Sequence, residues 1–122
     1  MSSPVTKLDS IGIPVRDPER ARRFYLQTLE LRPDAHSPWE FWVGDTCFSL
    51  WRPEQFGEPF EPQKNAIALL HVDDVTSARA DLEAKGVEFI GETFDTGVCH
   101  MATFLDPDRN QLILHNRYAP YE

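Results

Sequence analysis

Apolar residues recur at every second position in two stretches of the chain, at Ile11, Ile13 and Val15 and at Ala68, Leu70 and Val72. A period of two is typical of a strand that buries one face, so each stretch predicts a strand. The second stretch opens a repeat of the first, because Val15 and Asp17 recur as Val72 and Asp74, 57 positions later. The chain therefore contains two copies of one structural unit.

A helical pattern follows each of these strands. Asp17 and Pro18 provide an N-cap and a first-turn proline, after which apolar residues recur at helical spacing as far as Leu29. Asp74 provides the N-cap of the second helix, and Gly86 is placed to end it in a left-handed conformation. Both units therefore begin with a strand and a helix.

Three short strands are predicted after each helix. They cover residues 31–36, 39–43 and 46–51 in the first half, with a turn at Gly44 and Asp45, and residues 87–92, 98–105 and 111–116 in the second. The proline-rich segment between the halves argues against a strand or helix within it. This order predicts an α+β fold of two βαβββ modules, residues 5–52 and 66–118, joined by a linker at 53–65 within a single domain, 1–122.

Composition and charge narrow the function. The formal net charge of −8 disfavours nucleic acid and anionic membrane surfaces as partners. The longest aliphatic run, residues 66–70, is too short to span a bilayer, and residues 1–4 lack the basic start of a signal peptide. Cys47 and Cys99 have neither metal-ligand spacing nor a disulfide-rich context. We therefore expect a cytoplasmic protein with two packed thiols.

Four short segments occur in order along the two modules: Val15-x-Asp17, Ala21-x-x-Phe24-Tyr25, Val72-x-Asp74 and Asp106-Pro107-Asp108-Arg109-Asn110. Together with the repeated βαβββ order they resemble the vicinal oxygen chelate superfamily of glyoxalases, bleomycin-resistance proteins and extradiol dioxygenases. The resemblance covers nearly the whole chain and implies a concave half-barrel around a small-molecule cavity. Glu30 and Arg109 stand where the family usually has glycine, so a left-handed backbone there would cost on the order of 1 kcal/mol.

The resemblance also implies where a metal would bind. In metal-dependent members, one ligand comes from the first strand and one from the last strand of each half. Those positions fall on Ser10, Ser49, Ile67 and Ile113, none of which is a good metal ligand. We therefore expect no metal and no cofactor.

Strand alternation predicts which side chains share the face of the former metal positions, since residues two apart point the same way. If Thr103 pairs with Ile113 in the last hairpin, Met101 and Thr103 join that face. The ligand-binding residues that we predict are Trp51, His71, Met101, Thr103, Ile113 and His115. The alternative is a purely structural role for these residues, in which Trp51 packs in the core and the two histidines lie at the ends of their strands.

Three functions are compatible with these residues. The first is a metal-independent small-molecule-binding protein resembling bleomycin-resistance members, which enclose planar or cationic drugs with aromatic side chains. The alternative is a metal-free lyase, isomerase or cyclase that uses a cavity histidine as acid or base. Cys99 and His100 do not form a catalytic pair, because adjacent strand residues point to opposite faces. A metal-dependent glyoxalase or dioxygenase would require several strands to be misaligned.

We also expect a homodimer, because the modules leave strand edges that must be paired or covered. The aromatic segment 51–60 is a candidate for the interface. The cavity could close within one chain or across the dimer, and the sequence leaves this open.

Overall fold

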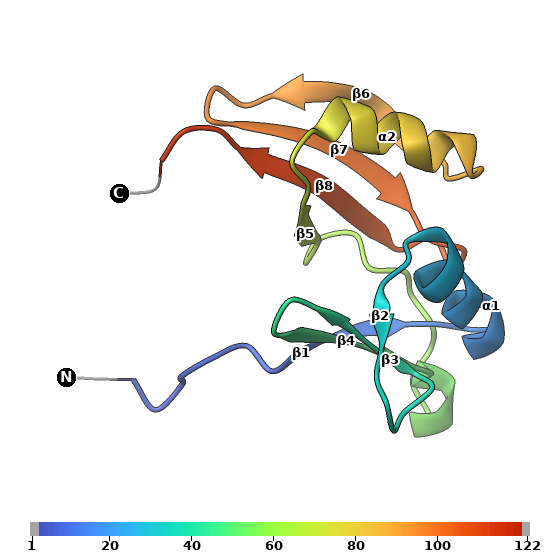
Figure 1. Cartoon of the computed structure of the whole chain (residues 1–122). Coiled ribbons are helices and arrows are strands. Elements are labelled where there is room, and N and C mark those ends of the chain that lie inside the picture. Colours follow the sequence, from blue (N-terminus) through green and yellow to red (C-terminus); the bar gives the residue numbers. More distant parts are fainter. Residues whose placement is uncertain (1–2, 121–122) are drawn as a thin grey trace.

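The computed structural model describes residues 3–120 as two sheets of four strands each, with a helix packed on each module (Figure 1). The first module contains β1 (Ser10–Pro14), α1 (Pro18–Arg23), the π-helical turn η1 (Phe24–Thr28), β2 (Arg32–Pro33), β3 (Glu40–Val43) and β4 (Thr46–Trp51). The second contains β5 (Ala68–His71), α2 (Val75–Ala84), β6 (Phe89–Asp95), β7 (Cys99–Leu105) and β8 (Gln111–Arg117). The predicted α+β fold of two βαβββ modules is confirmed.

Both sheets have the same topology. Their strand orders are β1-β4-β3-β2 and β5-β8-β7-β6, with the first strand parallel to the last strand of its module and the other pairs antiparallel. Thr103 lies opposite Ile113, which is the register on which the predicted face depends. Within residues 3–120 no strand pairing joins the two sheets, so each sheet has an outer edge of its own.

The predicted helix ends are confirmed by their hydrogen bonds. Asp17 Oδ1 accepts from the backbone N–H of Arg20 at 3.2 Å, and Asp74 Oδ1 accepts from that of Ser77 at 3.1 Å. Gly86 adopts a φ of 89° just after α2. These contacts satisfy backbone groups that a helix end leaves without an internal partner.

The two non-glycine residues in the turns do adopt left-handed backbone, with φ of 57° at Glu30 and 71° at Arg109. Each also forms an ion pair of 2.8 Å, Glu30 with Lys85 and Arg109 with Glu88. The turns therefore keep the backbone that usually favours glycine.

Three local predictions were wrong. The proline-rich linker contains a short 3₁₀ helix, η2 (Pro53–Phe56), because proline fits the first turn of a helix and Gly57, at φ 76°, can end it. β2 has only two residues, since the chain then turns around the Asp34 carboxylate, which accepts two backbone N–H bonds. β6 runs on to Asp95 through a register shift between Ile90 and Phe94.

The segment from Asp106 to Asn110 fastens the two modules together. Tyr25 donates its hydroxyl to Asp106 Oδ2 at 2.6 Å, and Asn110 Nδ2 donates to the carbonyl of Pro14 at 2.8 Å. Asp108 Oδ1 accepts from the backbone N–H of Arg16 and from the Arg20 guanidinium. Asp106, Asp108 and Asn110 are buried, and their hydrogen bonds to the first module hold the two modules together.

Candidate functional site

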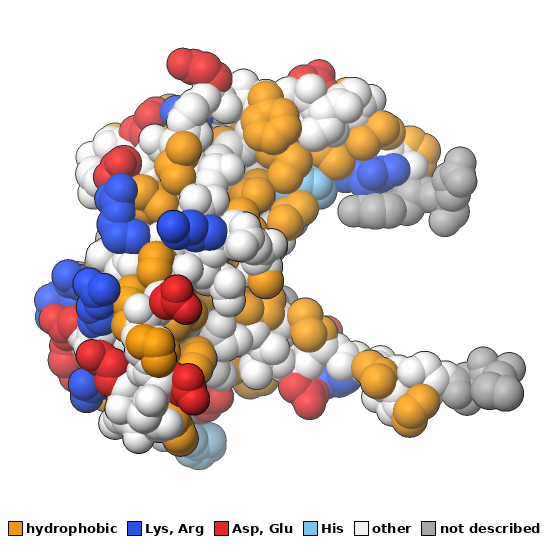
Figure 2. All heavy atoms as spheres, turned by 180° about the vertical axis from the view of Figure 1, so that it is seen from behind, with side chains coloured by type: hydrophobic (Ala, Val, Ile, Leu, Met, Phe, Trp, Pro, Cys, Tyr) orange, Lys and Arg blue, Asp and Glu red, His pale blue; other side chains and the backbone are white. Residues whose placement is uncertain are grey.

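Each sheet has one face packed against the core and one outer face that no helix covers. In β8, Leu112 and Leu114 belong to the core, so Ile113 and His115 point to the outer face. In β4, Phe48 and Leu50 belong to the core, so the outer face holds residues 47, 49 and 51. Figure 2 shows that the molecule is hollowed on one side, with hydrophobic side chains along part of the hollow.

No helix of the described residues is long and apolar enough to cross a membrane.

Five of the six predicted residues lie on the outer face of the second sheet. They form two neighbouring rows, each of which runs across the strands from one paired residue to the next. His115 lies between His71 on β5 and Met101 on β7, and Ile113 lies opposite Thr103. Ile113 is only 9% exposed, so it forms the floor of this face. His71 lies at the edge, where its Nε2 is 3.1 Å from Asp73 Oδ1 in an exposed contact.

Two hydrophobic residues of this face were missed. Phe94 lies opposite Met101 and Ile90 opposite Thr103, and both side chains are exposed. Ile90 lay within the predicted strand 87–92 but was not assigned to this face, and Phe94 lay beyond the end of that predicted strand. The structure thus extends the two rows across all four strands.

Trp51 lies apart from these rows, on the outer face of the first sheet. Its side chain is 40% exposed, so it is not a core residue. The indole lies over Gly12, where a Cβ atom would come within 3.2 Å of Nε1, and its ring centroid is 6.1 Å from that of Phe56. Within residues 3–120, no hydrogen bond or ring contact joins Trp51 to the five residues of the second sheet.

Glu40 is a carboxylate of this same face that sequence reasoning missed. It lies opposite Ser49, whose hydroxyl donates to Glu40 Oε2 at 3.1 Å, and the Cys47 thiol lies 3.7 Å from the same oxygen. The predicted turn at Gly44 and Asp45 would have revealed it, since a two-residue turn after residue 43 sets residue 40 opposite residue 49.

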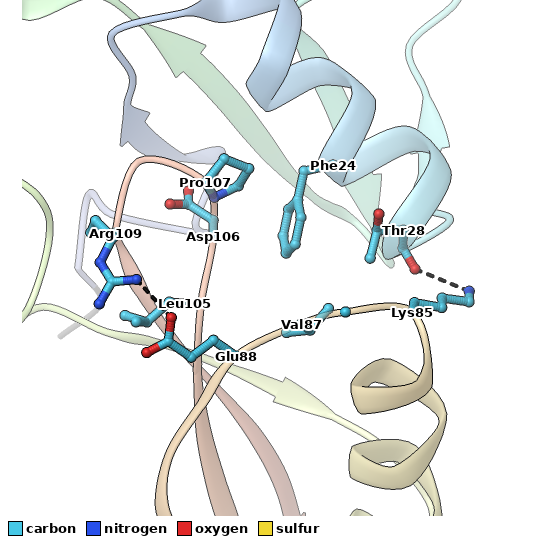
Figure 3. Close-up of a pocket in the computed structure, with 10 residues that line it drawn as sticks. Phe24, Thr28, Lys85, Val87, Glu88, Leu105, Asp106, Pro107 and Arg109 are labelled. Carbon is cyan, nitrogen blue, oxygen red and sulfur yellow. Dashed lines mark hydrogen bonds and ion pairs between the residues drawn. The ribbon is translucent and has the colours of Figure 1, made fainter.

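A crevice at the junction of the modules is a different kind of feature. The cavity of about 240 Å³ shown in Figure 3 has the Phe24 ring between Thr28 and Pro107. Its two cations are already paired: Lys85 Nζ binds Glu30 and the Thr28 carbonyl, and Arg109 binds Glu88. The Lys85–Glu30 ion pair joins the two modules, whereas the Arg109–Glu88 ion pair lies within the second module.

A family model described as the glyoxalase/bleomycin resistance protein/dioxygenase superfamily matches residues 7–114. The chain belongs to this superfamily. Among proteins with curated descriptions, none matches the chain.

Several solved structures of the superfamily are similar to it. TnmS3, an antibiotic-binding protein from Streptomyces sp. CB03234, is 27% identical with a TM-score of 0.74, over 95% of this chain and 99% of that one. A glyoxalase/bleomycin resistance protein from the same Streptomyces strain is 28% identical with a TM-score of 0.68, over 90% and 100%. A superfamily member from Sphaerobacter thermophilus DSM 20745 is 25% identical with a TM-score of 0.74, over 91% and 97%.

The residues at the superfamily's metal positions do not fit a metal. Ser10 is exposed, Ser49 donates to Glu40, and Ile67 and Ile113 have no donor atom. No group of three or more His, Cys, Asp or Glu side chains in the described part of the chain is arranged to hold a metal ion. Two hydroxyl groups do not replace water around a divalent ion, so we derive no chemistry through a metal in this member of the superfamily.

Proposed function

We propose that this chain is a metal-independent small-molecule-binding protein whose ligand lies against the outer faces of the sheets. One observation carries the proposal: large hydrophobic side chains are exposed together on the outer face of the second sheet, with Leu69 at 51%, Phe94 at 50% and Ile90 at 44%. Contiguous exposed apolar surface usually marks a binding site. The similarity to TnmS3, described as an antibiotic-binding protein, supports an organic ligand.

We further propose a homodimer, in which a second copy covers part of these outer faces. Trp51 and His115 lie on two sheets that share no strand pairing, so a site that uses both would be completed by packing between sheets. Exposed apolar surface on both sheets supports such packing. Two free buried cysteines support a reducing, cytoplasmic location.

The metal-free lyase, isomerase or cyclase remains the alternative, because His71 and His115 are neighbours in register. The carboxylate that hydrogen-bonds His71 belongs to Asp73, which is fully exposed, and the His71 side chain is itself 68% exposed. Water therefore weakens the influence of Asp73 on the imidazole, which favours binding over acid–base catalysis.

The test is a thermal-shift screen with antibiotics and metabolites, followed by titration of each hit. Trp51→Ala and His115→Ala should weaken binding at least tenfold. Cys99→Ala, which removes a buried thiol near the end of the same face, should bind normally. Circular dichroism must show that every variant is folded. Normal binding by folded Trp51 and His115 variants, with loss in Cys99→Ala, would mean that the wrong residues have been assigned.

A further inference from the structure

We propose that the outer face of the second sheet binds one copper(I) ion, with the imidazoles of His71 and His115 and the thioether of Met101 as its ligands. This inference goes beyond the proposed function, because it concerns a metal ion and not the organic ligand. It arises from the register of the sheet, which sets three donor side chains side by side in a single row.

The row crosses β5, β8 and β7, which are neighbours in the sheet (Figure 1). His71 on β5 pairs with His115 on β8, and His115 pairs with Met101 on β7. All three side chains project from the outer face, because the residues next to them in their strands pack in or against the core. Neighbouring strands are about 4.8 Å apart, a spacing across which long side chains can reach one another. The two outer donors can therefore meet an ion held above His115.

The donor types select the ion. Imidazole nitrogen and thioether sulfur are soft or intermediate ligands that suit copper(I), whereas magnesium, calcium and manganese favour oxygen. Zinc is bound in proteins by histidine together with thiolates or carboxylates, and this row has neither. Three neutral donors that include one sulfur therefore favour a soft monovalent ion over a divalent one.

This site uses none of the superfamily's metal positions, which fall on Ser10, Ser49, Ile67 and Ile113. It also differs in composition from a site made of His, Cys, Asp and Glu alone, of which the described residues contain no suitable group of three. Two imidazoles supply part of the ligand set here, and the methionine sulfur completes it.

Asp73 holds one of the ligands in a suitable orientation. Its Oδ1 lies 3.1 Å from His71 Nε2. With the proton on Nε2, His71 donates to this carboxylate and leaves the lone pair of Nδ1 for the ion. Metal-binding histidines commonly donate their second ring N–H to a carboxylate in this way, which fixes the tautomer and the ring. Asp73 is therefore a positioning residue and not a ligand.

Hydrophobic side chains border the three donors. Phe94 on β6 continues the row beyond Met101, and the neighbouring row contains Leu69 and Ile113. Such a border limits the access of water to a bound ion. The His71 side chain, which is 68% exposed, leaves the edge of the sheet open as the entry path.

The experiment measures the dissociation constant for copper(I) without oxygen, with ascorbate as reductant and bicinchoninate as a competing chromogenic chelator. A parallel titration with zinc and a fluorescent zinc indicator gives the comparison with a divalent ion. The proteins are wild type, His71→Ala, His115→Ala, Met101→Leu, Asp73→Asn and the control His100→Ala. His100 is a matched control because its Nε2 also lies near an aspartate, 3.6 Å from Asp95 Oδ2, but on the opposite face of β7.

We expect wild type to bind one copper(I) ion about a hundredfold more tightly than zinc. Each of the two ligand-histidine variants should weaken copper(I) binding about a hundredfold, and Asp73→Asn about tenfold. Met101→Leu should weaken copper(I) about tenfold and leave zinc unchanged, because only the soft ion depends on the sulfur. His100→Ala should change neither. X-ray absorption at the copper edge should show two nitrogen ligands and one sulfur ligand in wild type, with the sulfur absent in Met101→Leu.

Three results would overturn the copper site. The first is a wild type that binds no copper(I) or prefers zinc. The second is unchanged copper(I) binding in folded His115→Ala and Met101→Leu variants. The third is loss of copper(I) in Cys47→Ala or Cys99→Ala alone, which would assign the ion to a thiol. If circular dichroism shows that His115→Ala is unfolded, His115→Gln replaces it, and the wild-type absorption spectrum still identifies the ligands.

The proposed function is tested separately. The thermal-shift screen contains a copper chelator, so its hits do not depend on this site. An empty screen beside normal copper(I) binding would refute small-molecule binding alone, and hits beside absent copper(I) binding would refute the copper site alone.

Discussion

Replacing Tyr25 with phenylalanine should weaken the junction between the two modules. Tyr25 is fully buried, and its hydroxyl donates to Asp106 Oδ2, 81 residues away, at 2.6 Å. The phenylalanine ring would keep the packing against Phe41 and Phe48. The variant therefore removes one hydrogen bond between modules and little else.

The expected loss can be worked from the contacts. A hydrogen bond to a charged acceptor contributes about 1.5–3 kcal/mol. Asp106 Oδ2 keeps a second donor, Asn110 Nδ2 at 2.8 Å, so we expect a loss in the free energy of unfolding of about 2 kcal/mol. For a chain of this size that lowers the Tm by about 5–10 °C.

The loss should depend on pH. Burial raises the pKa of Asp106 above its ordinary value of 3.8, and the Tyr25 hydrogen bond opposes this rise. The folded protein thus binds the Asp106 carboxyl proton more tightly than the unfolded chain does. The stability contributed by protonation of Asp106 is fully present below pH 3.8 and is lost as the pH rises through the pKa of Asp106 in the folded protein. Without the hydroxyl the folded pKa rises further, so Tyr25→Phe should cost more near neutrality than in acid.

Urea unfolding followed by tryptophan fluorescence measures both effects. The matched control is Tyr118→Phe, because Tyr118 also donates to an aspartate, Asp95, at 2.7 Å, but on the surface. Water can replace that contact, so the control should change stability much less. Equal losses in the two variants, or no loss in Tyr25→Phe at neutral pH, would contradict a buried junction held by this bond.

Three further predictions concern the outer faces. Gly12→Ala places a Cβ atom 3.2 Å from Trp51 Nε1, so the indole must shift. We expect a changed tryptophan emission spectrum and weaker ligand binding, with a nearly unchanged free energy of unfolding. An unchanged emission spectrum would count against this contact. Purified protein should contain no stoichiometric divalent metal, and elemental analysis that finds about one zinc, iron, nickel or manganese per chain, with chelation abolishing folding or activity, would overturn this. Light scattering should give a dimer mass at micromolar concentration, and a monomer mass throughout that range would exclude the proposed homodimer.

Local patterns determined much of the fold. The 57-residue repeat, the caps at Asp17 and Asp74 and the left-handed turn positions follow from backbone sterics and periodicity within a few residues. Strand parity also assigned Ile113 and His115 to the outer face, because the period of two persists along an uninterrupted strand. Phe94 was missed because the predicted strand ended at residue 92, whereas β6 continues through a register shift to Asp95.

Tertiary structure alone decided how the two modules meet and which predicted residues are neighbours. The junction depends on hydrogen bonds between residues 81 to 96 positions apart, such as that from Asn110 to the Pro14 carbonyl, and such contacts leave no periodic pattern in the sequence. Trp51 and His115 share strand parity but lie on separate sheets, because parity fixes only the side of a sheet to which a residue points. The packing of one sheet against another depends on the shapes of two surfaces formed by distant parts of the chain.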